Sequence, residues 1–336
     1  MTTTSFAGRL QAFFTDYLPM QRNVSPHTVR SYRDTVTLLL RFCRDRQGLT
    51  IERLRVEQLS AELVIDFLNY LETERGCSIR TRNQRLAALH AFLRYLQIEA
   101  PEHILHCQRL LAIPPKKWGQ PALRYLTADQ MQAILAQPDL RTLWGRRDLA
   151  LLSLLYDTGA RVQELIDLRV RDVRLEAPAQ IQLTGKGRKT RIVPLMPNTI
   201  ALLADHLEEY RLDQPHHLDN PVFVNRHCQR FTRAGIRHLI RKYVTLAHQL
   251  QPHLPEHISP HTFRHSKAMH MLQAGIPLVI IRDFLGHVDV STSEIYARAD
   301  LEMKRRALEK LAPAPAAPAH TSWQDDGVLL AWLHAL

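Results

Sequence analysis

Between positions 259 and 300 the chain carries His261, Arg264, His287 and Tyr296, residue types that together suit chemistry at a phosphate ester. A phenol becomes a strong nucleophile only when it loses its proton, and nearby cations favour that loss. A guanidinium group offers paired N–H donors to phosphate oxygens, and an imidazole can accept or deliver a proton. The four side chains are therefore a candidate site for nucleophilic attack on a phosphodiester, provided that the fold brings them together.

Helix signals predict where the first two of these side chains lie. Ser259 followed by Pro260 is typical of a helix N-cap and first helical residue, because proline has no N–H to leave unsatisfied there. His261 and Arg264 then fall on one face of the first turn. Free backbone N–H groups and the helix dipole favour an anion at that place.

The other two side chains follow a second helix. Gly286 is suited to end that helix in the αL conformation, which leaves His287 just beyond its end. Ser291 and Glu294 have capping-box spacing, so we expect a further short helix that carries Tyr296 on a fixed face.

Arg161 is a second cationic candidate, in the stretch TGARVQELIDL. It lies at the predicted opening of a helix, where its charge opposes the helix dipole and needs a compensating anion. Glu164, three residues later, can orient the guanidinium group, and a bound phosphate can complete its hydrogen bonds. A simple surface ion pair is the alternative interpretation.

The charge of the chain indicates the kind of partner. Its 44 Lys and Arg residues outnumber 33 Asp and Glu, which gives a formal net charge of +11 and a pI near 9.8. Such a balance favours a polyanion, with nucleic acid first and a membrane surface second. There is no cationic leader with an apolar core and no run of about 18 apolar residues, so we expect a cytoplasmic protein without a membrane partner.

No metal, disulfide or other cofactor is predicted. Histidines recur every four residues from His253 to His265, but Pro255 and Pro260 forbid the continuous helix that a metal site would need there. The four cysteines lack zinc-ligand spacing.

Residues 179–195 change to a period of two, which predicts a β-hairpin with Gly185, Lys186 and Gly187 at its tip. Lys189 and Arg191 follow on the returning strand. We expect both to contact a nucleic-acid backbone, because their charges flank an exposed turn.

Residues 1–111 are predicted to form a module of four helices, and residues 112–121, rich in Pro, Gly and Lys, a linker. The fourth helix, at residues 80–96, begins with Arg80, Arg82 and Arg85, which suit phosphates and guanine edges. Lys116 and Lys117 in the linker could lie along the DNA backbone. For these cations simple solvation is the alternative.

Residues 122–311 are predicted to form a second, mainly helical domain around the hairpin. One of its helices carries Arg233, Arg237 and Arg241 as a stripe that could track phosphates. A Pro and Ala linker at 312–322 leads to an amphipathic helix at 323–336 that includes Trp332. A helix this short is marginal alone, so we expect it to dock on its own domain or on a neighbouring molecule.

The ordered motifs TGARVQELIDL, LTGKGRKTRIVPL, HTFRH, LGH and IYAR resemble the signature of the tyrosine recombinase (phage integrase) family. All six positions of that signature are filled, and the resemblance covers both predicted domains. It implies a mainly α fold with a small β-hairpin or sheet, in which a four-helix core-binding domain and an α+β catalytic domain clamp DNA.

The resemblance also implies roles at the phosphate. Tyr296 would be the nucleophile, and Arg161 and Arg264 would bind the scissile phosphate. Glu164 would hold the arm of Arg161. His287, where some members carry Trp, would donate a further hydrogen bond.

Proton transfers fall to other residues. His261 would accept or relay the phenolic proton, and Lys186 would protonate the departing 5′ oxygen, with Lys189 as the substitute if the hairpin tip is shifted. His265 would be a packing and hydrogen-bonding neighbour.

The implied reaction is strand exchange through a 3′-phosphotyrosine and a Holliday junction, without metal or ATP. Its implied substrate is double-stranded DNA with paired inverted repeats, bound by a nucleoid-associated tetramer, with partner recombinases or accessory factors as further candidates. The segment from about residue 312 extends beyond the common part of the family, and the resemblance favours exchange of its helix between protomers.

Other interpretations stay open. Strong basicity and the appended tail favour an integrase or transposase of a mobile element, and the alternative is an Xer-type resolvase of chromosome or plasmid dimers. A type IB topoisomerase shares the same chemistry but acts on one duplex. A non-catalytic DNA-binding accessory protein is a further alternative.

Overall fold

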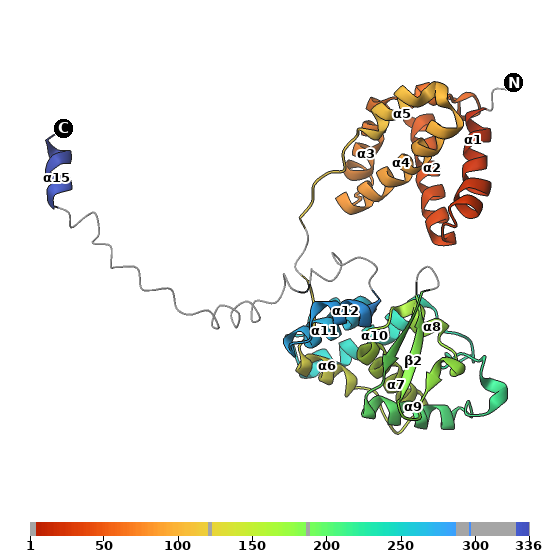
Figure 1. Cartoon of the computed structure of the whole chain (residues 1–336), viewed down its shortest axis with the longest axis vertical. Coiled ribbons are helices and arrows are strands. Elements are labelled where there is room, and N and C mark those ends of the chain that lie inside the picture. Colours follow the sequence, from red (N-terminus) through yellow and green to blue (C-terminus); the bar gives the residue numbers. More distant parts are fainter. Residues whose placement is uncertain (1–4, 120–122, 186–188, 287–295, 297–326, 336) are drawn as a thin grey trace. The chain divides into compact units, whose positions relative to one another are not determined.

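The computed structural model describes residues 5–119, 123–185, 189–286, 296 and 327–335. The chain divides into two compact units, Met1–Pro121 and Ala122–Leu336 (Figure 1). Each unit has its own hydrophobic core. Within the described ranges no helix is both long and apolar enough to span a bilayer. Among the same residues, no three His, Cys, Asp or Glu side chains are grouped so that they could hold a metal ion.

The N-terminal unit is a helical module. Its α-helices are α1 (Phe6–Ala12), α2 (Pro26–Gln47), α3 (Ala61–Thr73), α4 (Ile79–Glu99) and α5 (Ile104–Leu111). Helix α1 continues as a π-helix, η1 (Phe13–Gln21), and 3-10 turns lie in the other connections, namely η2 (Ile51–Arg53), η3 (Val56–Gln58) and η4 (Pro101–His103). The four helices that the sequence predicts are present, and α5 adds to them by burying Cys107 and Leu110.

Serine caps fix the starts of the three long helices in this unit. The hydroxyl groups of Ser25, Ser60 and Ser78 each accept the N–H of the residue three positions later, at the start of α2, α3 and α4. The apolar face of α4 packs against η1 in an aromatic cluster, where the Phe13 and Phe92 rings lie 5.2 Å apart.

The C-terminal unit consists of helices around a small sheet. Its helices are α6 (Ala128–Leu135), α7 (Leu143–Thr158), α8 (Val162–Asp167), α9 (Pro197–Glu209), α10 (Arg233–Leu250), α11 (Pro260–Gln273) and α12 (Leu278–Leu285). Two 3-10 turns, η5 (Val170–Asp172) and η7 (Pro215–His217), lie in its connections. A separate helix, α15 (Gly327–His334), lies near the end of the chain.

The sheet contains the predicted hairpin. Strands β2 (Gln180–Thr184) and β3 (Thr190–Pro194) pair antiparallel, with Ile181 opposite Val193. A two-residue strand, β1 (Val173–Arg174), extends the sheet in the order β1-β2-β3. Ile181 and Leu183 are buried, and Gln182 between them is exposed. The alternation of apolar and polar residues along β2 therefore matches its buried and exposed faces.

Helix α7 forms the centre of this unit. Its residues Leu151, Leu154 and Leu155 are fully buried, and the helix packs against α9 and α11. The Arg147 Nη2 group donates to Asp148 Oδ1 at 2.5 Å within the same core. Because α7 ends at Gly159, whose φ is +55°, the chain turns sharply there and enters α8 at Arg161.

Candidate active site

Helix α11 begins where its sequence predicts, and it carries Arg264 into the interior. Ser259 caps the helix through the N–H of Thr262, and Pro260 is its first residue. Arg264 is only 3 % exposed, and its two terminal nitrogens donate to the carbonyls of Gly159 at 2.6 Å and Leu285 at 2.5 Å. Burial, followed by the charges of two neighbouring arginines, lowers the pKa of Arg264 to about 9, so the group is a cation at neutral pH.

Arg161 reaches the same place from the start of α8, and Glu164 holds it. The Glu164 Oε1 atom accepts from Arg161 Nη1 at 2.7 Å, and Oε2 accepts the backbone N–H of Arg161 at 2.9 Å. Burial alone would raise the pKa of Glu164, but Arg191 and then Arg161 outweigh it and lower the pKa to about 2. Glu164 is therefore an anion at neutral pH and fixes the direction of Arg161.

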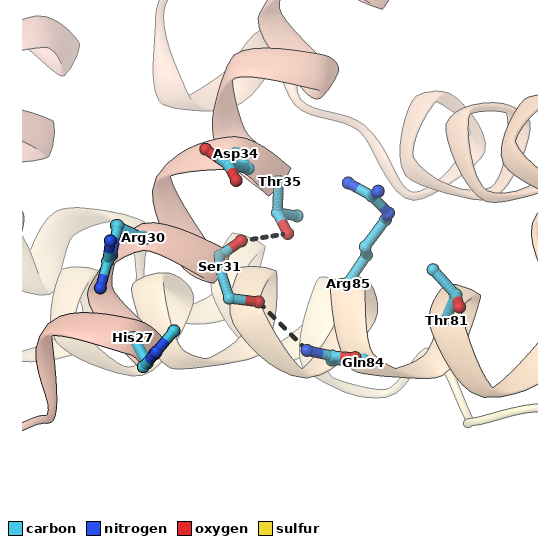
Figure 2. A pocket seen from close by; sticks show the side chains of 8 residues that line it. All are labelled: His27, Arg30, Ser31, Asp34, Thr35, Thr81, Gln84 and Arg85. Carbon is cyan, nitrogen blue, oxygen red and sulfur yellow. Dashed lines mark hydrogen bonds between the residues drawn. The ribbon is translucent and has the colours of Figure 1, made fainter. Parts of the chain in front are cut away.

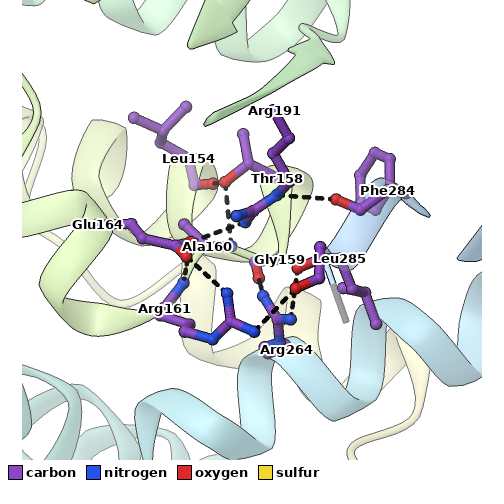
Figure 3. Close-up of polar contacts among 11 residues, drawn as sticks. Leu154, Thr158, Gly159, Ala160, Arg161, Glu164, Arg191, Arg264, Phe284 and Leu285 are labelled. Atoms are coloured by element: carbon purple, nitrogen blue, oxygen red, sulfur yellow. Dashed lines mark hydrogen bonds and ion pairs between the residues drawn. The ribbon is translucent and has the colours of Figure 1, made fainter. Parts of the chain in front are cut away.

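Three guanidinium groups meet the last turn of α12 (Figure 3). Arg191 donates from Nε to the carbonyl of Phe284 at 2.9 Å, Arg264 to Leu285, and Arg161 from Nη2 to Gly286 at 3.1 Å. The last carbonyls of a helix have no partner inside the helix and carry its negative dipole end. These three successive carbonyls therefore hold cations from β3, α11 and the start of α8 together.

Tyr296 lies against the same cluster. Its side chain is fully buried among Met269, Leu272, Ile281 and Leu285, which come from α11 and α12. Burial raises the pKa of Tyr296 to about 12. The positive charges of Arg264 and Arg161 act in the opposite direction. The phenol is therefore uncharged at neutral pH, close to the cations that would favour its ionisation.

The imidazole of His265 contacts the phenol. The Tyr296 Oη and His265 Nδ1 atoms are 3.1 Å apart. Burial, then the nearby His261 and Arg264, lower the pKa of His265 to about 4. The neutral ring can accept the phenolic proton in a hydrogen bond when its own proton is on Nε2. His261 is exposed on the first turn of α11, and its ring lies 6.4 Å from that of His265.

Lys186 and His287 lie outside the described residues, but the residues before them contact the cluster. A methyl group placed on Gly185 would lie 2.8 Å from Glu164 Oε1 and 3.3 Å from Arg161 Nη1. Gly286 accepts the hydrogen bond from Arg161. The residues that directly precede Lys186 and His287 therefore both lie next to the Arg161–Glu164 pair.

Two of the expected DNA contacts have other partners in the structure. Arg191 was expected to face a DNA backbone, but its side chain is 10 % exposed and donates to Glu164 Oε2 at 2.7 Å as well as to Phe284. Arg82 is 8 % exposed and forms an ion pair with Glu72 at 3.1 Å. Each arginine forms an ion pair with a carboxylate from a separate helix, a partner that spacing along the sequence does not reveal.

Other cations of the N-terminal unit are more accessible. Arg80 is exposed and lies over the Trp118 ring at 5.7 Å. Lys116 pairs with Glu72 at 2.8 Å, while Lys117 is exposed. These two exposed side chains, Arg80 and Lys117, remain available to a phosphate backbone.

A groove of about 400 Å³ is lined by residues of both α2 and α4 (Figure 2). Residues that the sequence reasoning did not single out line it together with Arg85, including Arg30 and Gln84, and Gln84 donates to Ser31 Oγ at 3.1 Å. The groove also contains Asp34, so it is polar and not uniformly basic. Polar residues at helical spacing on the outer face of α2 were the available signal for this groove.

In the C-terminal unit Lys189 and three arginines of α10 face solvent. Arg233, Arg237 and Arg241 are exposed, and Arg233 donates from Nε to Gln163 Oε1 at 2.7 Å. These cations are exposed, whereas Arg264 is buried.

Comparisons with known proteins agree with both units. The Phage integrase family profile matches residues 124–303, and the profile of the Phage integrase, N-terminal SAM-like domain matches residues 12–107. An integrase/recombinase of Sinorhizobium fredii, y4rC, is 38 % identical over 334 residues, which cover 99 % of this chain and 98 % of the relative. That alignment therefore includes the C-terminal extension.

Two further similarities concern Xer proteins. The tyrosine recombinase XerD of Listeria monocytogenes is 31 % identical over 84 % of this chain and 91 % of its own length. The crystal structure of the XerH site-specific recombinase bound to its palindromic difH substrate superposes with a TM-score of 0.65 at 20 % identity, covering 86 % of this chain and 81 % of that one. This second similarity concerns the fold alone.

Proposed function

The chain belongs to the phage integrase family, whose members are tyrosine-type site-specific DNA strand transferases, and on this premise we propose the part that each residue plays. Tyr296 Oη attacks the scissile phosphorus, forms a 3′-phosphotyrosyl bond and breaks the bond to the 5′ oxygen. Arg161 and Arg264 bind the non-bridging oxygens, where negative charge accumulates during the attack. His287 donates a further hydrogen bond, and Lys186 gives its proton to the departing oxygen.

One observation carries this proposal. Arg161 and Arg264 lie 103 positions apart in the chain, yet they donate to adjacent carbonyls at the end of α12, and both charges act on the Tyr296 phenol. A phosphate that replaced these carbonyls would receive paired donors from two directions. Positive side chains would then neutralise the charge that a metal ion neutralises in other phosphoryl transfers, so the proposed reaction uses neither metal nor ATP.

The proton of Tyr296 needs an acceptor during attack. In the DNA-free protein the phenol contacts His265, whose low pKa makes it a weak base, so this contact holds Tyr296 neutral. We propose that the bound phosphate draws Tyr296 towards the arginines, and that His261, exposed on the first turn of α11, accepts or relays the proton there. The charge of the phosphate would raise the proton affinity of either histidine.

The DNA substrate is proposed to be a duplex with paired inverted repeats. The groove between α2 and α4 offers Arg30, Gln84 and Arg85 to base edges, and Arg80 offers a charge to the backbone. In the C-terminal unit Lys189 and the exposed α10 arginines would follow phosphates. Partner recombinases or accessory factors could join this complex, which would be associated with the nucleoid.

Assembly into a tetramer on DNA would exchange strands through a Holliday junction. Trp332 of α15 is 59 % exposed, and on α12 Val279 and Ile280 are 53 % and 52 % exposed, so apolar surface is present on both elements. We propose that α15 docks on a neighbouring protomer. Crosslinking of the tail in an assembled complex should yield intermolecular products, and intramolecular products alone would contradict the exchange.

A mobile-element integrase or transposase is the preferred role, and the Xer-type resolvase is the second candidate because Xer recombinases match over most of the chain. Inverted repeats in the DNA that flanks the gene would support the first role. Recombination between two fragments that each carry a site would separate both roles from a type IB topoisomerase.

Cleavage itself is tested with a nicked suicide duplex, which traps the covalent intermediate. Wild-type protein should form an SDS-resistant adduct with the 3′ side of the break, and Tyr296→Phe should form none. Tyr210→Phe is a matched control, because the Tyr210 hydroxyl is buried without a hydrogen-bond partner and its loss should leave the adduct unchanged. Adduct formation by Tyr296→Phe at the wild-type rate would overturn the proposal.

A further inference from the structure

Arg191 is a hairpin residue whose side chain is turned into the protein and contacts the groups that hold Arg161. It is the second residue of β3, and its side chain is 10 % exposed. Its Nη2 group donates to Glu164 Oε2 at 2.7 Å, and its Nε group donates to the Phe284 carbonyl at 2.9 Å (Figure 3). The same side chain packs against Gly286, where an added Cβ would lie 3.1 Å from Arg191 Cδ.

The contact with Glu164 completes the support of Arg161. Glu164 is 4 % exposed, so its charge must be satisfied by protein groups. One carboxylate oxygen accepts from the Arg161 side chain, and the other accepts from both the Arg161 backbone and Arg191. Without Arg191, one oxygen would keep only a backbone partner, and the carboxylate could rotate away from Arg161.

The contact with Phe284 fixes a second part of the site. The carbonyls of Phe284, Leu285 and Gly286 would otherwise be unpaired at the C-terminal end of α12. Arg191 takes the first, so the other two remain aligned with Arg264 and Arg161. Residue 287 follows directly in the chain.

We propose that Arg191 is a positioning residue for strand cleavage. It holds Glu164, and through it Arg161, in a fixed position relative to the end of α12, and it does not contact DNA. This inference rests on the proposed role of Arg161 at the scissile phosphate. Arg191 also belongs to the hairpin that carries Lys186, so one side chain ties three separated segments of the site to each other.

The carboxylate of Glu164 provides a readout for this role. The charged groups that face it are Arg161 from the start of α8, Arg191 from β3 and, farther away, Arg264 from α11. The groove beside it is also lined by Asp167, Arg169, Arg171 and Asp172. Arg191 is the largest influence that lowers the pKa of Glu164, and burial opposes it.

Replacement of Arg191 should therefore raise the pKa of Glu164. A carboxylate with a raised pKa takes up its proton as the pH falls, and a protonated Glu164 no longer holds Arg161 as an ion pair. Cleavage by Arg191→Met should then show an additional loss at acidic pH that wild-type cleavage does not show.

The experiment measures the rate of phosphotyrosyl adduct formation at saturating suicide DNA from pH 5 to pH 8, together with the Kd for the duplex. We expect Arg191→Met to cleave at least about tenfold more slowly at pH 8, because a small displacement of a phosphate-binding group has a large effect on rate. Its Kd should stay within about twofold of wild type, since a buried side chain contributes no phosphate contact.

The ratio of wild-type to variant rates should increase further as the pH falls. Arg191→Lys, which keeps the charge near Glu164, should restore a ratio that is independent of pH. The double variant Arg191→Met, Glu164→Gln should also have a constant ratio, because the titrating group is gone. Arg141→Met removes an exposed arginine that pairs with Asp139 and should behave as wild type.

Three results would overturn the proposal. If Arg191→Met weakens DNA binding but cleaves at the wild-type rate when saturated, Arg191 is a backbone contact. If its rate ratio does not change with pH, Glu164 is not the coupled group. If Arg191→Met does not fold, Arg191→Lys decides alone, because one ammonium group cannot make both hydrogen bonds of Arg191: slower cleavage at a wild-type Kd supports the role, and an unchanged cleavage rate refutes it. Absence of any adduct from wild type would instead refute the proposed function.

Discussion

Gly185→Ala should damage the site through a single added methyl group. The Cβ would lie 2.8 Å from Glu164 Oε1 and 3.3 Å from Arg161 Nη1, closer than van der Waals contact allows. An ordinary contact requires a separation larger by roughly 0.5 Å or more. A flexible carboxylate could move aside, but Glu164 is 4 % exposed and accepts hydrogen bonds from Arg161 and Arg191, so it cannot yield without losing one of them.

The expected magnitude follows from the cost of overpacking, which is about 1–3 kcal/mol. If this strain displaces Arg161 from the phosphate position, the cleavage rate falls between about fivefold and about 150-fold, because about 1.4 kcal/mol corresponds to a factor of ten. If the strain instead falls on the folded state as a whole, the free energy of unfolding decreases by the same amount.

Two measurements separate these outcomes. Suicide-duplex cleavage at saturating DNA reports the effect on chemistry, and urea unfolding reports the effect on stability. Gly119→Ala is the matched control, because an added Cβ there meets nothing within 4 Å. Wild-type cleavage and wild-type stability in Gly185→Ala would refute the close packing of the hairpin base against the Arg161–Glu164 pair.

Three further predictions concern the same unit. Tetranitromethane should leave Tyr296 unmodified in the DNA-free protein, because the phenol is fully buried and burial raises its pKa to about 12; mass spectrometry of tryptic peptides would reveal nitration there if the prediction is wrong. The lowered pKa of Glu164, about 2 against an ordinary 4.5, stabilises the fold above pH 4.5, and this contribution, about 3 kcal/mol, is lost as the pH falls towards 2. The difference in unfolding free energy between wild type and Glu164→Gln should therefore shrink over that range, and a constant difference would contradict it. Arg147→Met should cost about 3–5 kcal/mol of stability by leaving Asp148 buried without its cation, as measured by urea unfolding, whereas a loss below about 1 kcal/mol would contradict the buried pair.

Local signals in the sequence were sufficient for several elements of the site. The start of α11 could be predicted because Ser259 and Pro260 act within one turn of helix, and the structure places the cap there. The hairpin could be predicted because alternation of Ile181 and Leu183 with polar residues reports burial on one face. Arg161 and Glu164 were expected to pair because three residues of helix bring them together.

Partners that are distant in the chain could not be predicted in this way. Arg82 and Arg191 resemble any other cation of a basic segment, and only the folded structure shows that each forms an ion pair with a carboxylate from a separate helix. The contact of His265 with Tyr296 joins two residues 31 positions apart, so spacing along the sequence did not indicate it. The sequence shows which residues are cationic. Which of them contact the substrate, and which pair with other side chains of the protein, depends on how deeply the fold buries them.

The most direct test of the account is to identify the residue that becomes attached to DNA. Wild-type protein would be trapped on a suicide duplex labelled on either side of the break, digested with trypsin and analysed by mass spectrometry. The account predicts one nucleotide-bearing peptide, with the 3′ phosphate on Tyr296, and loss of this peptide when Arg161 or Arg264 is replaced by Met. A 5′ linkage, or an adduct on any other residue, would contradict it.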